Sequence, residues 1–328
     1  MPMKRLSHSV IFVAVTVLSC LAARAAGWEK LPSLPVPNAG FACGVLGDKI
    51  VVLGGTNWTD DTKHWLDAIW VFDTTSLQWR PHGVLPHPLA YSVTSRINDG
   101  LLIAGGSDGT QPRREIWLVK PSLELVKTGL LDEGAALSLG GVVDDRLLML
   151  GGCADVAKLD GMRKGGRQYH LHDKGSSALP PAGDHPSGLG AMAVAGRELF
   201  IFGGAMHDPV KLVANLDNAW AFDAAKGTWR ALKAYPFAVR GATTLALDEH
   251  RILIAGGCGG EPEHFIAEAF VYDVRRDAYT QAMDLPQAAL AALVMNGDYV
   301  YCLGGEDRKK HRTDACWRIR VGDLLSPR

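Results

Sequence analysis

Six of the nine pairs of adjacent glycines divide the chain into units of similar length, and this repeat constrains the fold more than any other feature. Each of these six pairs follows a short apolar run, and successive ones lie 46 to 53 residues apart. Two glycines after a strand permit a sharp turn and a close approach of backbones. The pairs are Gly54-Gly55, Gly105-Gly106, Gly151-Gly152, Gly203-Gly204, Gly256-Gly257 and Gly304-Gly305. A period near 50 residues with four strands per unit is typical of kelch blades, so the sequence predicts an all-β, six-bladed kelch β-propeller.

Most units carry one aromatic residue at a third-strand position, from which it is expected to pack between blades. The third unit has His170 there and is therefore expected to be irregular. The aromatic residues in this register are Trp70, Trp117, Trp220, Phe270 and Trp317.

A second aromatic register predicts how the ring closes. Trp79 lies seven residues before Pro86, a spacing that recurs in two later units and marks a fourth strand. Trp28 lies seven residues before Pro35, so the first strand of the chain is also a fourth strand. Because the last unit ends after its third strand, the N-terminal strand is expected to complete the sixth blade and remove its open edge. The expected blades are residues 36–86, 87–132, 133–183, 184–236, 237–286, and 287–325 with 27–35.

Residues 1–25 have the pattern of a signal peptide, and residues 26–328 form the predicted propeller. Two basic residues precede an apolar core at 10–21, and a small-x-small cleavage signal follows at 23–25. The sequence therefore predicts an exported protein, periplasmic or secreted, with no membrane span in the mature chain. Cys20 is a poor match to a lipoprotein processing site. A net charge of −1 does not favour a nucleic-acid partner.

The cysteines and histidines predict neither a disulfide framework nor a metal site. Removing the signal peptide leaves five cysteines, an odd number. Cys302 and Cys316 lie on neighbouring predicted strands and could pair. No CxxC or HExxH sequence occurs, so no metal or other cofactor is expected.

The sixth glycine pair is followed by a carboxylate and, six residues later, by an arginine. Glu306 and Arg312 stand at opposite ends of a predicted loop, before a strand that begins near Asp314, and can converge. A carboxylate can transfer protons, and a guanidinium can hold an anionic group bidentately. The alternative interpretation is an ordinary ion pair across the mouth of a β-hairpin.

Other polar residues are expected on the same face of the ring. Loops after the glycine pairs supply Asn57 and Asp108, and segments between blades supply Tyr91 and Arg240. These connections surround the axis on one face of a propeller. The sequence therefore predicts a polar funnel in which these four residues are candidates to bind substrate; the alternative for each is an ordinary solvated loop group.

Five segments in the first two blades and the last carry a family resemblance. They are Gly54-Gly-Thr-Asn-Trp, His64-Trp-Leu-Asp-Ala-Ile-Trp70, Pro88-Leu-Ala-Tyr91, Gly105-Gly-Ser-Asp-Gly109 and Gly304-Gly-Glu…Arg312-Thr. They resemble the cyclically permuted branch of the sialate mutarotase family, also called the N-acetylneuraminate epimerases. The resemblance implies a cofactor-free, typically periplasmic isomerase that interconverts the α and β anomers of sialic acid. It also implies Glu306 as proton acceptor and Arg312 as its companion. The sequence departs from the family pattern at Lys309-Lys310-His311, where proline and glycine are usual.

Two other functions are compatible with a kelch propeller, since propellers host many unrelated activities. A non-enzymatic module would bind a protein or a glycan and would not need a convergent Glu306–Arg312 pair. A copper enzyme of the galactose-oxidase type would need tyrosine and histidine ligands with a crosslinking cysteine, and the sequence shows no such set.

Overall fold

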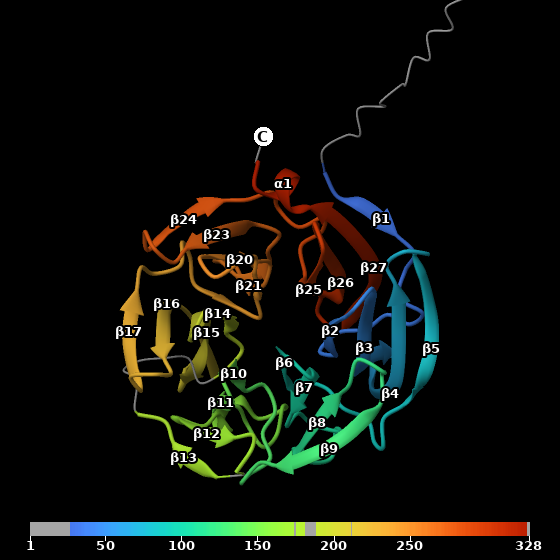
Figure 1. Ribbon diagram of the computed structural model, residues 1–328. Coiled ribbons are helices and arrows are strands. Elements are labelled where there is room, and N and C mark those ends of the chain that lie inside the picture. The colour runs from blue at the N-terminus through green and yellow to red at the C-terminus, as the bar shows by residue number, and fades with distance from the viewer. Residues whose placement is uncertain (1–26, 174, 181–187, 211, 327–328) are drawn as a thin grey trace, which may run out of the picture.

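The chain folds into a ring of antiparallel β-sheets around a central axis (Figure 1). The computed structural model describes residues 27–173, 175–180, 188–210 and 212–326. The predicted signal peptide, with Cys20, lies outside the described residues. The described residues form six four-stranded sheets, one in each predicted blade, and one small three-stranded sheet. The predicted all-β propeller architecture is therefore confirmed.

The four-stranded sheets are named blades 1 to 6 in chain order. Blade 1 contains β2 (Ala42–Leu46), β3 (Lys49–Thr59), β4 (Thr62–Asp73) and β5 (Gln78–Val84). Blade 2 contains β6 (Val93–Ile97), β7 (Gly100–Ala104), β8 (Glu115–Val119) and β9 (Leu125–Leu130). Blade 3 contains β10 (Leu139–Val143), β11 (Arg146–Leu150), β12 (Gly166–His170) and β13 (Ser176–Ala178), with the 3-10 helix η1 (Leu159–Gly161) between β11 and β12.

The second half of the ring continues the same order. Blade 4 contains β14 (Ala191–Ala195), β15 (Glu198–Asp208), β16 (Leu212–Asp223) and β17 (Thr228–Leu232). Blade 5 contains β19 (Thr243–Ala246), β20 (Arg251–Ala255), β23 (Ala269–Asp273) and β24 (Ala278–Gln281). Blade 6 contains β25 (Leu290–Asn296), β26 (Tyr299–Arg308), β27 (His311–Arg320) and β1 (Glu29–Leu31), and helix α1 (Val321–Leu324) follows. The small sheet contains β18 (Val239–Arg240), β21 (Cys258–Gly259) and β22 (His264–Phe265).

The N-terminal strand β1 closes the ring, as predicted. It pairs antiparallel with β27, where Glu29 faces Arg318. Arg318 Nε donates to Glu29 Oε2 at 2.9 Å. Trp28 Nε1 donates to the carbonyl oxygen of Asp284 at 2.7 Å, which connects β1 to the segment that follows blade 5.

The core lies between neighbouring sheets. The second strand of each blade is an apolar run whose two faces both pack against other blades, and in β3 the run Ile50–Leu53 is fully buried. Strands that are buried on both faces read as continuous apolar runs. This arrangement explains why each glycine pair is preceded by consecutive apolar residues rather than by an alternating pattern.

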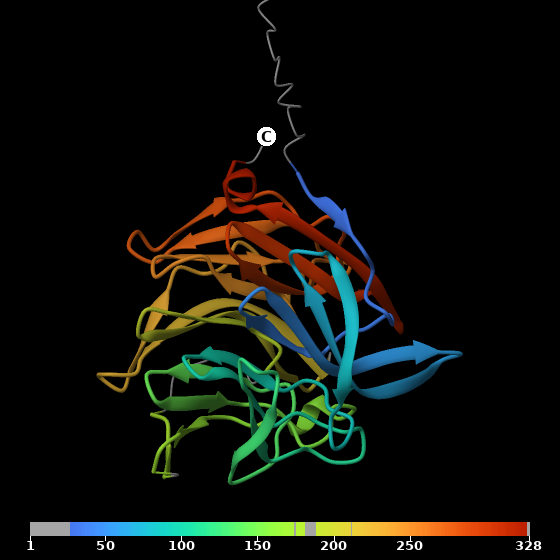
Figure 2. The ribbon, with the colours of Figure 1, turned by 45° about the vertical axis from the view of Figure 1, so that its right-hand side comes forward.

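Three blades extend their second and third strands past the glycine pair as long hairpins. These are β3–β4, β15–β16 and β26–β27, and Figure 2 shows β3–β4 (blue) projecting from the ring. The loop expected between Glu306 and Arg312 is therefore wrong. The strands resume pairing after a bulge at the glycine pair, β27 begins at His311, and only Lys309-Lys310 form the turn.

Blade 3 lacks an outer aromatic residue. In blades 1, 4 and 5, aromatic residues face each other on the third and fourth strands, as the pairs Phe72–Trp79, Phe222–Trp229 and Tyr272–Tyr279. The corresponding pair in blade 3 is Tyr169–Ser176. The register also corrects the assignment of His170, because Arg167 faces Met149 as Trp70 faces Val52.

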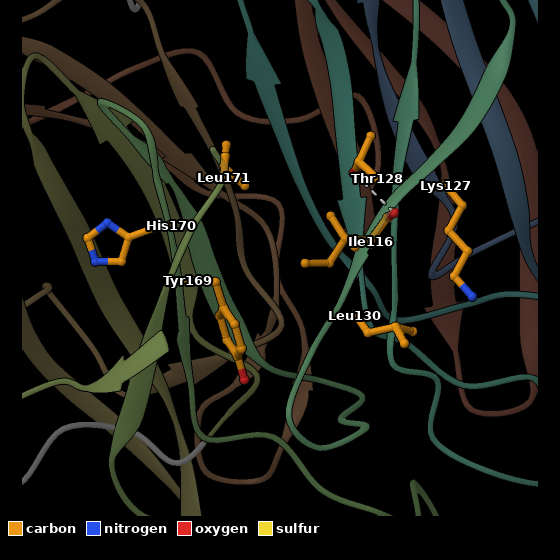
Figure 3. A pocket seen from close by; sticks show the side chains of 8 residues that line it. Ile116, Lys127, Thr128, Leu130, Tyr169, His170 and Leu171 are labelled. Atoms are coloured by element: carbon orange, nitrogen blue, oxygen red, sulfur yellow. Dashed lines mark hydrogen bonds between the residues drawn. The ribbon is translucent and has the colours of Figure 1, made fainter. Parts of the chain in front are cut away.

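A cleft of about 480 Å³ lies between blades 2 and 3. Figure 3 shows Tyr169 and Leu171 on one side of it and Ile116 and Leu130 on the other. The cleft is on the outer side of the ring, away from the residues predicted to bind substrate, and no carboxylate lines it.

The disulfide considered for Cys302 and Cys316 is not formed, and all five cysteines that the structure describes are free. Cys302 faces Trp317 across the strands, whereas Cys316 faces Leu303. Because successive side chains alternate between the faces of a sheet, the two thiols point in opposite directions. They are buried in different core clusters.

Candidate active site

Glu306 and Arg312 face each other on β26 and β27, and their side chains form an ion pair. Arg312 Nη1 lies 2.7 Å from Glu306 Oε2. The Arg312 side chain is only 4% exposed, and that of Glu306 is 25% exposed. Arg312 Nε also donates to Thr56 Oγ1 of blade 1 at 3.4 Å. The convergence expected from the sequence is therefore observed, and the guanidinium is held from two blades.

Glu306 occupies a position at which the other blades have small side chains. The residues that follow the other glycine pairs are Thr56, Ser107, Cys153, Ala205 and Cys258. Each of these pairs with the segment that begins its own blade, and Glu306 also pairs with the segment that begins blade 6, although one residue further along, at Leu290 of β25. A glutamate in this inner ring places a carboxylate close to the axis.

A second ring, here called the collar, consists of one residue at the inner start of each blade. The collar residues are Gly40, Tyr91, Leu137, Leu189, Gly241 and Leu290. The first five have left-handed backbone conformations, with φ between 57° and 70°. Backbone hydrogen bonds join neighbouring members, such as Tyr91 N to Gly40 O at 2.8 Å and Leu137 N to Tyr91 O at 3.0 Å. A left-handed conformation costs a non-glycine residue about 1–2 kcal/mol.

The collar, Glu306 and Arg312 line a cavity of about 280 Å³. Blade 6 supplies its charged groups, and Tyr91 of blade 2 adds a hydroxyl group. Leu137 of blade 3 and Leu189 of blade 4 make another part of the wall apolar. A concave site with a few polar groups on an apolar wall is the usual form of a small-molecule site.

Tyr91 is held in place by the hairpin of blade 1. Its hydroxyl oxygen lies 3.3 Å from Thr56 Oγ1. Its ring packs edge to face with Trp65, with centroids 5.6 Å apart, and Lys63 Nζ lies 4.7 Å from the centroid of each ring. A Cβ atom at Gly40 would come within 2.5 Å of the Tyr91 ring, so glycine is required beside it. Tyr91, Thr56, Arg312 and Glu306 therefore form a continuous chain of polar contacts.

Arg240 lines a neighbouring cavity of about 950 Å³ between blades 4 and 5 and the hairpin turn of blade 6. Its guanidinium donates to Glu263 and, at 2.8 Å, to Asn215 Oδ1. The hydrogen bond to Glu263 raises the pKa of Arg240 against the opposing effect of burial, and the charge of Glu306 adds to the increase. Arg240 thus lies close enough to Glu306 for their charges to interact, although its guanidinium group donates its hydrogen bonds to Glu263 and Asn215.

The other two predicted substrate-binding residues do not line the cavity of Glu306. Asn57 follows Thr56 on β3, so its side chain points to the opposite face of the sheet, and its Oδ1 accepts from the Trp58 amide at 2.7 Å. Asp108 binds its own loop, accepting from the Thr110 hydroxyl at 2.7 Å and from Arg113 at 3.1 Å.

The electrostatics of Asp108 agree with a structural role. Burial alone would raise the pKa of Asp108, but the hydrogen bonds from its loop and the charge of Arg113 lower it to about 2. A role in substrate binding stays a prediction for both Asn57 and Asp108.

Two absences concern the described part of the chain alone. Among these residues, no three His, Cys, Asp or Glu side chains are grouped closely enough to hold a metal ion. None of the helices described is both long and apolar enough to cross a membrane.

Several residues of this site could not be recognised from the sequence patterns described above. Thr56 follows its glycine pair as Glu306 does, and this shared position was the signal that could have identified it. The stack of Lys63 and Trp65 on Tyr91, and the leucines of the collar, depend on contacts between blades and have no comparable local pattern.

The kelch motif family matches residues 37–81, which include the first three strands of blade 1 and the beginning of its fourth strand. N-acetylneuraminate epimerases of Brucella suis and Brucella melitensis are each 32% identical to this chain over 120 residues, covering 29% of this chain and 30% of the relative. A putative F-box/kelch-repeat protein of Arabidopsis thaliana is 34% identical over 80 residues, covering 24% of this chain and 20% of the relative. The solved structure of YjhT has a TM-score of 0.72 with 15% identity, covering 89% of this chain and 97% of that chain.

These comparisons support different conclusions. The similarity to YjhT extends over the ring and shows the fold, while the epimerases are similar in sequence over less than a third of their own length. The chain is a kelch-repeat β-propeller, and the matches confirm its resemblance to the N-acetylneuraminate epimerase family.

Proposed function

We propose that the protein is an isomerase, a mutarotase that interconverts the α and β anomers of N-acetylneuraminate by acid–base catalysis. The observation that carries the proposal is the Glu306–Arg312 pair, which lines the axial cavity at an inner-ring position where the other blades have small residues. The names of the Brucella relatives support the choice of sugar acid.

The chemistry of anomer exchange fits a carboxylate beside a guanidinium. N-acetylneuraminate is a cyclic hemiketal with a carboxylate on its anomeric carbon. Exchange removes the proton of the anomeric hydroxyl, breaks the bond from the anomeric carbon to the ring oxygen, and protonates that oxygen. The open-chain ketone then closes on its other face by the reverse steps. Proton transfer by positioned side chains is sufficient for this reaction.

The proposed roles follow the contacts in the site. Glu306 accepts and returns the proton, because its carboxylate lines the cavity, is 25% exposed, and is held at Oε2 by Arg312. Arg312 orients Glu306 and attracts the substrate carboxylate, which brings the anomeric carbon against Glu306. Tyr91 stands at the other end of the series of polar contacts that runs through Thr56 and Arg312 to Glu306, and its proposed role is to hydrogen-bond the sugar. Arg240 adds positive charge near Glu306.

The alternative function is a kelch module that binds a protein or a glycan without catalysis. The match to a putative F-box/kelch-repeat protein favours this alternative, since that name states no enzymatic activity. A binding module has no need for a carboxylate in the inner ring, which is why the mutarotase is preferred.

The test is an anomer-exchange assay with residues 26–328. Freshly dissolved crystalline N-acetylneuraminate consists of one anomer, and NMR follows its equilibration with and without protein. We expect the protein to increase the rate above the spontaneous rate in proportion to its concentration. A spontaneous rate at every protein concentration, with folded protein, would favour the binding module.

A further inference from the structure

The charged side chains that line the cavity around the axis all lie on one side of it. Glu306 and Arg312 lie on blade 6, whereas Leu137 belongs to blade 3, across the ring from blade 6 (Figure 1). Leu189 of blade 4 continues the apolar wall. These two leucines are partly exposed and line the cavity, and neither belongs to a core cluster of the described residues.

The backbone at these leucines does not explain why leucine is present. Leu137 and Leu189 have φ of 59° and 57°, a conformation that glycine adopts without strain. Gly40 and Gly241 occupy the matching collar positions in blades 1 and 5. We therefore attribute the presence of leucine at these two positions to the contacts of its side chain, which offset the strained backbone conformation. Unfavourable backbone conformations of this kind concentrate at functional sites.

Left-handed leucines elsewhere in the chain have a different explanation. Leu77 and Leu123, with φ of 55° and 68°, lie in turns at the rim of the ring, and their side chains pack against core clusters. The leucines of the collar differ from them because they face a cavity.

We propose that Leu137 and Leu189 are specificity-determining residues that receive the apolar end of an N-acyl group on the sugar acid, while its carboxylate lies toward Arg312. The inference rests on the proposed function and extends it to the orientation of the substrate. An acetamido methyl group gains from contact with leucine, whereas a hydroxyl group at the same carbon loses its hydration there without finding an acceptor. The site therefore selects N-acylated sugar acids over analogues that carry a hydroxyl group.

The experiment compares kcat/KM for anomer exchange of N-acetylneuraminate and of the analogue with a hydroxyl group in place of the acetamido group. We expect the parent protein to prefer the acetamido sugar by about 10-fold or more, the range for small apolar contacts. The double variant Leu137→Gly, Leu189→Gly keeps the backbone conformation and should lower that preference at least about 5-fold, approaching equal rates. Leu123→Gly relieves similar strain outside the cavity and should keep the parent preference.

A second double variant, Leu137→Asn, Leu189→Asn, covers the case in which the glycine variant does not fold. Asparagine tolerates the left-handed conformation and offers a polar amide in a branched side chain with as many heavy atoms as that of leucine, so it should shift the preference toward the hydroxyl analogue. An unchanged preference in a folded double variant that still accelerates exchange would overturn the role of the leucines and leave the mutarotase standing. A parent protein that accelerates neither sugar would overturn the mutarotase itself, and the role of the leucines with it.

Discussion

Tyr169 on β12 faces Ser176 on β13, in the place where blades 1, 4 and 5 have two aromatic residues. In blade 1 the outer residue, Trp79, donates through its indole nitrogen to Pro32, at the blade junction, at 3.1 Å. Ser176 instead donates to Asp132, which follows blade 2, at 2.7 Å. A serine cannot cover the junction as an indole ring does, and we attribute the cleft between blades 2 and 3 to this difference (Figure 3).

We expect Ser176→Trp to stabilise the ring by filling this junction. An indole ring that leaves water for contact with Tyr169 gains apolar burial, and an aromatic pair adds about 0.5–1.5 kcal/mol. The net gain, after loss of the hydrogen bond from Ser176, should be about 1 kcal/mol in urea unfolding. Ser177→Trp is the matched control, because its side chain points to the opposite face of β13. Equal stability changes in the two variants would contradict the account of the cleft.

Deletion of residues 27–35 should open blade 6. The deletion removes β1, its pairing with β27, and the buried side chains of Leu31 and Leu34, which are 5% and 3% exposed. Loss of two buried leucines alone costs about 4–10 kcal/mol. Thermal unfolding of this variant should therefore begin far below that of a control that starts at residue 26. Coincident melting curves would show that closure by β1 does not stabilise the ring.

The repeat explains how much of this fold could be predicted. The glycine pairs and the Trp28-to-Pro35 spacing encode blade number and closure locally, because each blade repeats the same turn and strand pattern. The position of Glu306 followed from the same repeat, because the sequence shows a glutamate directly after a glycine pair where the other units have small residues.

Other features depend on contacts between blades and could not be predicted from the sequence. The hairpin of Glu306 and Arg312 forms because pairing resumes after a bulge, whereas the charged residues between them suggested a loop. The left-handed conformations of Leu137 and Leu189 arise where neighbouring blades contact at the axis. The position of Ser176 opposite Tyr169 could not be predicted, because the third-strand register of blade 3 is shifted by three residues from the spacing assumed for His170.

The buried thiols make stability depend on pH in the alkaline range. Burial raises the pKa of Cys316 from the ordinary value of 9.0 to about 12, and burial also raises that of Cys302. The unfolded chain loses these protons first, so the stability that Cys316 contributes is complete below pH 9 and falls between pH 9 and about 12. We expect Cys316→Ala to reduce the loss of unfolding free energy between pH 9 and pH 10 by about 1 kcal/mol. Parallel pH profiles for variant and parent would contradict this.

Arg312 should matter for substrate capture more than its charge alone implies. Arg312→Lys keeps a positive charge but loses the planar fork that reaches Glu306 and Thr56. We expect KM for N-acetylneuraminate to rise more than kcat falls. Steady-state exchange rates over a range of sugar concentrations measure both, and a fall in kcat at constant KM would remove the carboxylate role from Arg312.

The central claim is that Glu306 transfers the proton, and the rate of anomer exchange by Glu306→Gln tests it most directly. Glutamine keeps the shape and a neutral oxygen beside Arg312 but cannot accept the proton, so NMR should show a rate about 100- to 10,000-fold below that of the parent. Asp307→Asn is the matched control, since this neighbouring carboxylate is paired with His311, does not line the cavity of Glu306, and should leave the rate unchanged. The account predicts a folded Glu306→Gln protein with little or no acceleration. A folded Glu306→Gln protein that exchanges anomers at the parent rate would contradict it.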